Sequence, residues 1–392
     1  MVLNVLPLFL ANVLGVRVWA VGAVEGLADT TASIVKLYSG WLSDRFGTRK
    51  WLAVSGYAIS SLAKPFYLIA TSWTHVAGIR WGDRVGKGVR TAPRDALLAD
   101  SSAPERRGLV FGLHRAADTA GAVLGLLITI WVVDRVQGGG LLLEAEAFRS
   151  LVLWSLLPAF AAVLLLAAGA SDIQKPAQAT AKRSEQTADL SRPQIRLRGL
   201  GRGFGWFVVC SVLFELGNSA DAFLVLRAQE RGLSVIDVLW VLLAFNVVYT
   251  LVSAPAGALS DRLGRKGMIL AGWAIYALCY AGFATATTAG HVIGLYLVYG
   301  AYHGLVAGAA KALVADLVPS HLVALAFGGY AAAVGIVSLP ASVLAGVLWE
   351  GFGAWEGFGA WAPFAFGAAT ATLAAVLLML FVPSHGEDEV AG

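Results

Sequence analysis

Charged side chains are concentrated in one otherwise apolar stretch, residues 74–99, and their spacing is helical. The stretch contains Arg80, Asp83, Arg84, Lys87, Arg90, Arg94 and Asp95. At 100° per residue, its five cations fall within an arc of about 120° on one face of a helix. Each central cation would cost roughly 2.5–3.5 kcal/mol if it faced lipid hydrocarbon. If this helix lies in a membrane, we therefore expect its cationic face to line protein or a water-filled cavity.

Ionisable and amide side chains in four other apolar stretches are candidate partners for this face. They are Glu25 and Asp29, then His114, Arg115 and Asp118, then Glu215, Asn218 and Asp221 on one face of a continuous helix, and Lys311. In one interpretation the cations attract an anionic or polar solute, and a carboxylate such as Asp29, Asp118, Glu215 or Asp221 takes up a coupling proton. In the other, acids and cations form buried ion pairs that only fix helix packing. Because intramembrane ionisable groups usually mark pathways, we favour the first interpretation for the cluster as a whole.

The composition is that of a membrane protein. Of 392 residues, 58% are hydrophobic and only 14% are charged, against about 25% charged in soluble domains. One aqueous core cannot bury so much apolar surface, which excludes a cytosolic globular enzyme, a secreted disulfide scaffold and a disordered regulator. The net charge of +4 is modest and calls for no nucleic-acid partner. The expected partner is the lipid bilayer.

A bilayer-spanning helix needs about 20 mostly apolar residues, and the sequence predicts twelve spans. They are 1–14, 16–39, 51–70, 74–99, 108–133, 150–170, 204–226, 238–256, 267–290, 291–317, 322–349 and 361–382. They divide into two bundles, 1–170 and 204–383, joined by a basic linker 171–203 and followed by a disordered tail 384–392. Because basic loops stay in the cytoplasm, the linker and both termini of the full-length form are expected there.

The two predicted bundles repeat each other. Gly40–Gly47 matches Gly257–Gly264 at a numbering offset of 217 (257 − 40), and Ala96–Asp100 matches Ala312–Asp316 at an offset of 216 (312 − 96). Parallel halves are typical of secondary transporters, with the substrate site between them near mid-membrane. The same offset would begin the counterpart of the seventh span before residue 1, which predicts that the chain starts inside its first helix. A genuinely short first helix is the alternative.

The loop 40–50 and its repeat 257–266 resemble the signature loop of the major facilitator superfamily. The resemblance implies an all-α fold of twelve transmembrane helices in two pseudo-symmetric six-helix bundles, and a transporter rather than an enzyme. It assigns a conformational lock to Gly40, Asp44, Arg45, Gly47, Arg49, Lys50 and Asp100, and to Gly257, Asp261, Arg262, Gly264, Arg265 and Asp316. Thr48 departs from the family pattern, which has a cation there, so the first-half ion pair is absent or has moved to Arg49. The run Asp83–Asp95 further resembles a prokaryotic subgroup, which implies the plasma (inner) membrane.

The resulting expectation is a monomeric secondary transporter that moves a small organic solute by alternating access. The proton gradient is the expected energy source, without cofactor or metal, and export is favoured over uptake on family frequency. One alternative is a uniporter or anion exchanger that uses the cationic cleft without protons. Another is a membrane-embedded enzyme or lipid-handling protein, which the sequence disfavours because it shows no catalytic constellation.

Overall fold

The computed structural model describes residues 1–46, 49–101, 107–172, 201–219, 221–318 and 323–383. These ranges are helical apart from connections and one isolated bridge between Phe352 and Trp355. Within them, nine helical segments are long and apolar enough to cross a membrane. Of the other three predicted spans, two form helices of 29 and 28 residues that carry more charge, and the first, Val2–Val13, is apolar but shorter.

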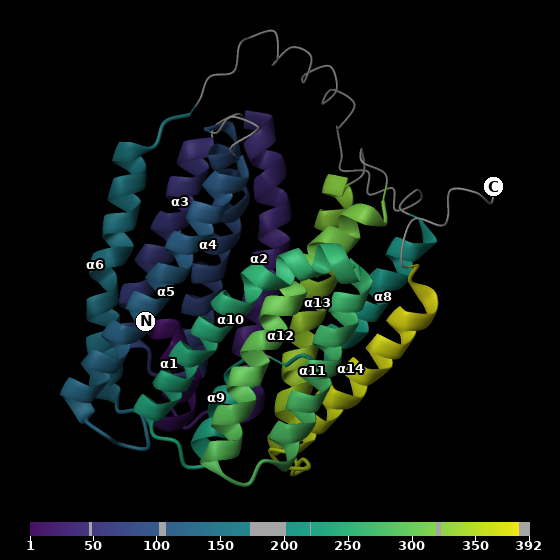
Figure 1. Ribbon diagram of the computed structural model, residues 1–392. Helices are drawn as coiled ribbons and strands as arrows, with labels where there is room; N and C mark the ends of the chain where they lie inside the picture. Colours follow the sequence, from purple (N-terminus) through teal and green to yellow (C-terminus); the bar gives the residue numbers. More distant parts are fainter. Residues whose placement is uncertain (47–48, 102–106, 173–200, 220, 319–322, 384–392) are drawn as a thin grey trace.

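The first six predicted spans form the N half of the molecule (Figure 1). Its elements are α1 (Val2–Leu8) with the π-helical turn η1 (Phe9–Val13), α2 (Val18–Phe46), α3 (Arg49–Ala63) with the 3-10 stretch η2 (Lys64–Ile69), α4 (Trp73–Asp100), α5 (Arg107–Gln137) and α6 (Ala145–Gly169). The C half contains α8 (Arg202–Gly217), α9 (Ala222–Glu230), α10 (Val235–Leu263), α11 (Arg265–Thr285), α12 (Ala289–Asp316), α13 (Val323–Glu350) and α14 (Ala362–Phe381). Both halves are helix bundles, as predicted.

The seventh span corrects the prediction of one continuous helix. It divides into α8 and α9, and the helix stops between Gly217 and Ala222. Asn218 leaves the helical conformation at φ −85° and ψ 82°. Glu215, Asn218 and Asp221 therefore do not share one helical face, because they lie on the two sides of an interruption.

Equivalent helices of the two halves begin with the same local chemistry. The Ser72 hydroxyl accepts a hydrogen bond from the backbone N–H of His75 at the start of α4, and Thr288 does the same for His291 at the start of α12, both at 3.3 Å. Such caps satisfy N–H groups that a helix leaves free at its first turn. The numbers of the two capping residues differ by 216 (288 − 72), so the structure reproduces the sequence repeat.

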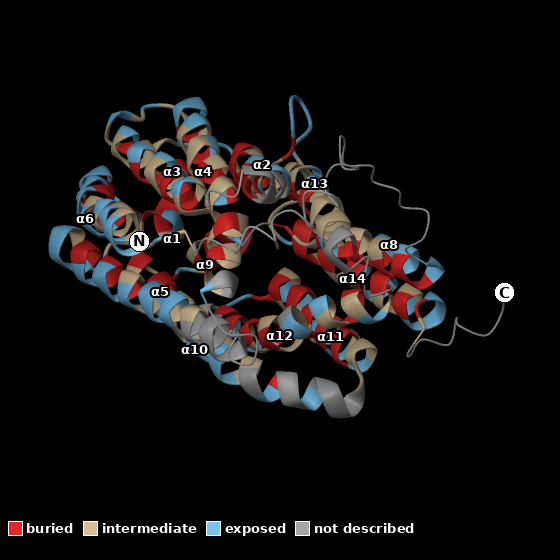
Figure 2. Cartoon of the chain, turned by 90° about the horizontal axis from the view of Figure 1, so that it is seen from above, coloured by how far each residue is buried: buried red, intermediate tan, exposed pale blue. Residues whose placement is uncertain are grey.

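Among the described residues, the two halves contact each other mainly toward one end of the molecule. Figure 1 shows them spreading apart toward the end where α6 stops and α8 starts, here called the open end, and Figure 2 shows the two bundles side by side from above. At the opposite, closed end α2 packs on α13, where a Cβ at Gly22 would collide with the Ser342 carbonyl. The Thr30 hydroxyl donates to the Gly335 carbonyl at 2.6 Å. Arg17 pairs with Glu350 at 3.3 Å. Small residues and polar contacts thus hold the closed end together.

Candidate functional site

Two ion pairs of unequal quality connect α4 to α2. The Arg80 guanidinium contacts the Glu25 carboxylate at 2.6 Å and the Asp83 carboxylate at 3.6 Å, and its side chain is only 3% exposed. Arg84 lies 3.6 Å from Asp29, whose side chain is 47% exposed. The Nε atoms of both arginines and the Nη1 of Arg80 find no hydrogen-bond partner among the described residues, so the two pairs differ in distance and exposure. Arg80 is therefore fixed within the helix packing, whereas the Arg84–Asp29 pair is loose and open on the Asp29 side.

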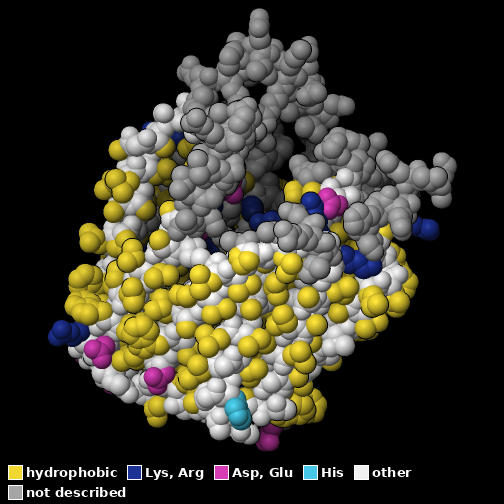
Figure 3. Space-filling model, viewed as in Figure 1, with side chains coloured by type: hydrophobic (Ala, Val, Ile, Leu, Met, Phe, Trp, Pro, Cys, Tyr) yellow, Lys and Arg dark blue, Asp and Glu magenta, His cyan; other side chains and the backbone are white. Residues whose placement is uncertain are grey.

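Basic side chains of α4 and η2 line a cavity of about 530 Å³ inside the N half. Lys64, Arg84, Lys87 and Arg90 contribute positive charge to its wall, and Asp83 and Asp118 contribute negative charge. Arg90 donates to the Ser60 hydroxyl at 2.7 Å and stands 4.5 Å from the centre of the Tyr57 ring. With four cations against two acids, this wall favours an anionic group. Figure 3 shows Lys and Arg side chains in the recess between the halves at the open end.

Other predicted residues on α4, α5 and α12 are less closely associated with this network. Arg94 pairs with its neighbour Asp95 at 2.9 Å. The Nε2 of His114 is buried with no hydrogen-bond partner among the described residues. Lys311 is exposed and forms no ion pair with any residue that the structure describes. The side chain of Arg115 lies outside the described residues.

The interruption of the seventh span forms a polar site in the C half. The Asn218 amide donates to the Glu215 carboxylate at 3.1 Å. The Tyr276 hydroxyl donates to the Gly217 carbonyl at 3.2 Å, and the Tyr299 hydroxyl donates to the Asp221 carboxylate at 3.2 Å. Interrupted transmembrane helices typically bind substrates or coupling ions, because their free backbone and terminal side chains face a cavity. Among the described residues, no group of three His, Cys, Asp or Glu side chains could hold a metal ion.

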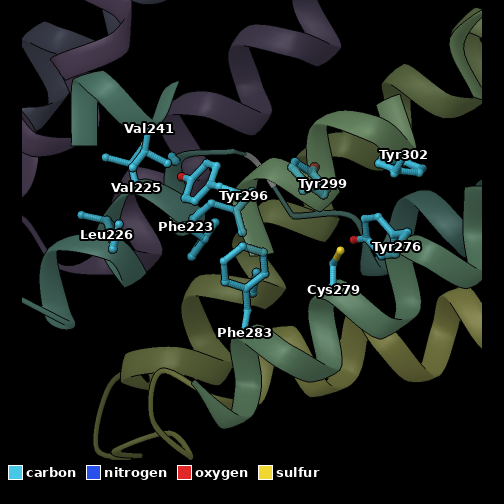
Figure 4. Packing of buried hydrophobic residues seen from close by; sticks show 14 of the residues in the cluster. Phe223, Val225, Leu226, Val241, Tyr276, Cys279, Phe283, Tyr296, Tyr299 and Tyr302 are labelled. Atoms are coloured by element: carbon cyan, nitrogen blue, oxygen red, sulfur yellow. The ribbon is translucent and has the colours of Figure 1, made fainter. Parts of the chain in front are cut away.

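The tyrosines behind this interruption were not predicted from the sequence. Tyr276, Tyr280, Tyr296, Tyr299 and Tyr302 pack with Phe283 and other rings into a buried aromatic cluster (Figure 4). The rings of Tyr276 and Tyr280 stack with centroids 4.0 Å apart. The repeat could have identified part of this cluster, because an offset of 216 relates Tyr296 to Arg80 and Tyr299 to Asp83 (296 − 80, 299 − 83).

Carboxylates from both halves come near one another. The Glu215 carboxylate of the C half lies within Coulomb range of Asp221 and of Asp29 in the N half. Asp29 in turn contacts Arg84 at 3.6 Å. The arrangement therefore links ionisable groups of α2, α4 and α8, which can bind a charged group or exchange a proton.

The signature loops at the open end use equivalent arginines. Arg265 donates to the Ala312 carbonyl at 2.8 Å and pairs with Asp316 at 2.5 Å. Arg49 donates to the Ala96 carbonyl at 2.9 Å, which is the same contact at the repeat offset of 216 (265 − 49, 312 − 96). Arg49 thus makes the backbone contact that Arg265 makes in the other half. Thr48 is one extra residue in the first loop, which explains why the offset changes from 217 to 216.

An acidic residue that follows α6 binds the first backbone N–H groups of α3. The Asp172 carboxylate accepts hydrogen bonds from the backbone N–H groups of Arg49 and Lys50 at 3.1 and 2.8 Å. A Cβ added at Gly40 would lie 3.5 Å from the Ala92 Cβ, which is an ordinary van der Waals contact. Gly264 ends α10 at a φ of +80°. Outside the described residues lie Gly47 and the side chains of Asp44, Arg45, Asp100, Asp261 and Arg262, and nothing is described of Gly257 beyond its place in α10.

Comparisons with known proteins agree on one family. The family model described as Major Facilitator Superfamily matches residues 1–234 and 203–392. An uncharacterized MFS-type transporter of Methanocaldococcus jannaschii is 30% identical over 356 residues, 89% of this chain and 84% of that protein. A mutant of the nucleoside transporter NupG has a similar fold, with a TM-score of 0.75, 13% identity, and coverage of 97% and 95%. The inward-open xylose transporter XylE from E. coli has a TM-score of 0.69, 16% identity, and coverage of 94% and 87%. The chain therefore belongs to the Major Facilitator Superfamily, and it is a membrane transporter, not an enzyme.

Proposed function

We propose that this protein is a proton-coupled secondary transporter that moves a small organic solute by alternating access. Proton and solute bind together in the coupling step described below, so an inward proton gradient drives uptake, in place of the export expected from family frequency. The observation that carries the proposal is the Arg84–Asp29 pair, 3.6 Å long and open on the Asp29 side. Glu215 of the other half interacts electrostatically with Asp29. A site to which both halves contribute ionisable groups changes its surroundings when the halves rearrange, which is what coupled transport requires.

The coupling step follows from the electrostatics of this pair. A proton on Asp29 cancels its charge and weakens its attraction to Arg84, which lies 3.6 Å away. The released guanidinium can then hold an anionic group of the solute by charge-assisted hydrogen bonds. Arg80 is not expected to respond, because Glu25 holds it at 2.6 Å in a buried position.

Alternating access would exchange the contacts at the two ends. In this structure α2 and α13 close one end, with Arg17 and Glu350 paired there at 3.3 Å. We propose that the signature residues at the open end, with Arg49 and Arg265 at their centre, stabilise the opposite state when that end closes. If the basic loops are cytoplasmic, the open end faces the cytoplasm. We further propose a monomer in a prokaryotic plasma membrane, with both termini of the full-length form cytoplasmic.

The test is transport in proteoliposomes under an imposed pH gradient, with a solute found by thermal-shift screening of anionic and cationic metabolites. We expect Asp29→Asn and Asp221→Asn to lose gradient-driven flux and to keep solute counterflow. Asp118→Asn tests the acid of the N-half cavity in the same way. The matched control is Asp134→Asn, since Asp134 is exposed near the end of α5 and should leave flux unchanged. If none of the three variants alters gradient-driven flux, the coupling assignment is wrong.

A second candidate function is a uniporter or anion exchanger without proton coupling. The excess of cations over acids in the wall of the N-half cavity favours it, because fixed positive charge can bind an anion without a titrating partner. In that case counterflow of an anion is unaffected by the pH gradient and is lost in Arg84→Gln. Under the coupled mechanism, Arg84→Gln also weakens binding, but the flux of the unaltered protein follows the gradient.

A further inference from the structure

A duplicated aromatic segment connects α13 to α14 at the closed end (Figure 1). The sequence Gly-Phe-Gly-Ala-Trp occurs twice, at 351–355 and 357–361, with Glu356 between the copies. The corresponding connection of the N half, residues 138–144 between α5 and α6, contains no aromatic residue. The segment is therefore a feature of the C half alone, and the transport site described above does not use it.

Backbone contacts give this segment a defined shape. The Phe358 and Gly359 N–H groups donate to the carbonyls of Leu348 and Trp349 at 2.9 and 3.1 Å, which returns the second copy to the last turn of α13. Gly351 has a φ of +88°, and a Cβ at this position would collide with the Trp355 carbonyl. A segment fixed in this way can present its side chains in a constant direction.

Its aromatic side chains point away from the protein core. Phe352 and Phe358 are 58% and 60% exposed, and Trp355 and Trp361 are 42% and 51% exposed. Trp355 and Phe358 contact each other edge to face at 5.2 Å, and Phe352 also meets Trp19 of the N half at 5.3 Å. Exposed aromatic surface of this density usually marks an interaction site.

The position of the segment identifies the partner. It lies where two membrane helices end, and α14 begins directly after Trp361 with an outer face that exposes Leu373, Val376 and Leu380. Aromatic rings are enriched at that depth, where hydrocarbon meets lipid headgroups. The segment contains a single charge, Glu356, and lacks the polar rim typical of protein interfaces. We propose that residues 351–361 insert into the headgroup region of the leaflet at the closed end, with Phe358 and Trp361 in contact with lipid.

Site-directed fluorescence can test this directly, because the two native cysteines, Cys210 and Cys279, are buried. Phe358→Cys is labelled with an environment-sensitive fluorophore and reconstituted into phosphatidylcholine vesicles that contain spin-labelled phosphatidylcholine. Thr287→Cys is the control, because Thr287 is exposed in the short polar connection between α11 and α12 at the same end. Trp361→Cys is a second position in case the first variant is poorly folded.

We expect the spin-labelled lipid to quench the label at position 358 about threefold more than the label at 287, with the reverse order for aqueous iodide. Equal quenching by iodide at both positions would place the segment in water and overturn the proposal. Resistance to both quenchers would show that protein covers the segment, a second copy or another partner, and would overturn it as well. The result does not depend on the transported solute or on coupling.

Discussion

The equivalent helices α4 and α12 have the same length and cap but different chemistry along their inner faces. Each contains 28 residues, and the repeat offset of 216 pairs their positions. Arg80, Asp83 and Lys87 of α4 correspond to Tyr296, Tyr299 and His303 of α12 (296 − 80, 299 − 83, 303 − 87). The facing positions on α2, Glu25 and Asp29, become Leu242 and Asn246 on α10 at the offset of 217 (242 − 25, 246 − 29). The N half packs these helices through ion pairs, and the C half packs them through aromatic rings.

The two halves therefore share the positions of their helices but differ in the side chains that pack between them. Buried ion pairs depend strictly on both partners, because removing one leaves an uncompensated charge. Aromatic packing depends on volume and ring geometry and tolerates the loss of a hydroxyl. In the C half the acids come instead from the interrupted seventh span, at Glu215 and Asp221. In the N half the charged groups are held in ion pairs between helices. In the C half they lie beside the interruption of the seventh span.

The largest change in the free energy of unfolding is expected when the Glu25–Arg80 pair of the N half is replaced by the equivalent residues of the C half. Glu25→Leu leaves buried Arg80 with only the longer contact to Asp83, so we expect a loss of about 3–5 kcal/mol in the free energy of unfolding. The double variant Glu25→Leu/Arg80→Tyr carries the residues of the C half and should recover most of this loss. Reversible unfolding in mixed detergent micelles measures both. A single variant as stable as the unaltered protein would show that the ion pair does not hold α2 to α4.

A smaller loss in the free energy of unfolding is expected for one tyrosine of α12 and not for another. Tyr299→Phe removes the hydrogen bond to Asp221, so we expect a loss of about 1 kcal/mol in the free energy of unfolding. Tyr296→Phe is the matched control, since its buried hydroxyl has no hydrogen-bond partner among the described residues, and it should be neutral or slightly stabilising. The same unfolding assay compares them. Equal losses would contradict the assignment of a specific Tyr299–Asp221 contact.

The smallest change in stability is expected at the signature loops, where equivalent substitutions in the two halves should have equal effects. Arg265 and Asp316 have side chains 33% and 50% exposed, so a double-mutant cycle with alanine should give a coupling of about 0–1 kcal/mol. Arg49→Ala should resemble Arg265→Ala in stability, and both should slow transport in proteoliposomes if these loops lock a state. Normal transport rates in both variants would remove the loops from the mechanism.

The sequence predicted the fold well and the site only in part. Span positions, two bundles and the repeat followed from hydrophobic length and motif spacing, because a membrane imposes both on any chain that crosses it. The helical spacing of the α4 charges also predicted a shared face. The sequence did not predict the stop after Gly217, since Asn218 and Asp221 fit a continuous helical pattern equally well. The aromatic cluster around Tyr276 and Tyr299 was likewise missed, because buried tyrosines look like ordinary apolar packing in a sequence.

By itself the sequence determined a polytopic membrane protein with two repeated halves and cations that cannot face lipid, because composition and periodicity are one-dimensional properties. The tertiary structure decided which acid meets which cation, placing Glu25 against Arg80 and Asp29 against Arg84. It also gave Arg49 and Arg265 the same backbone contact in the two signature loops. These choices depend on how helices that are distant in the sequence rotate and pack against each other, and the distances between their side chains exist only in the folded protein.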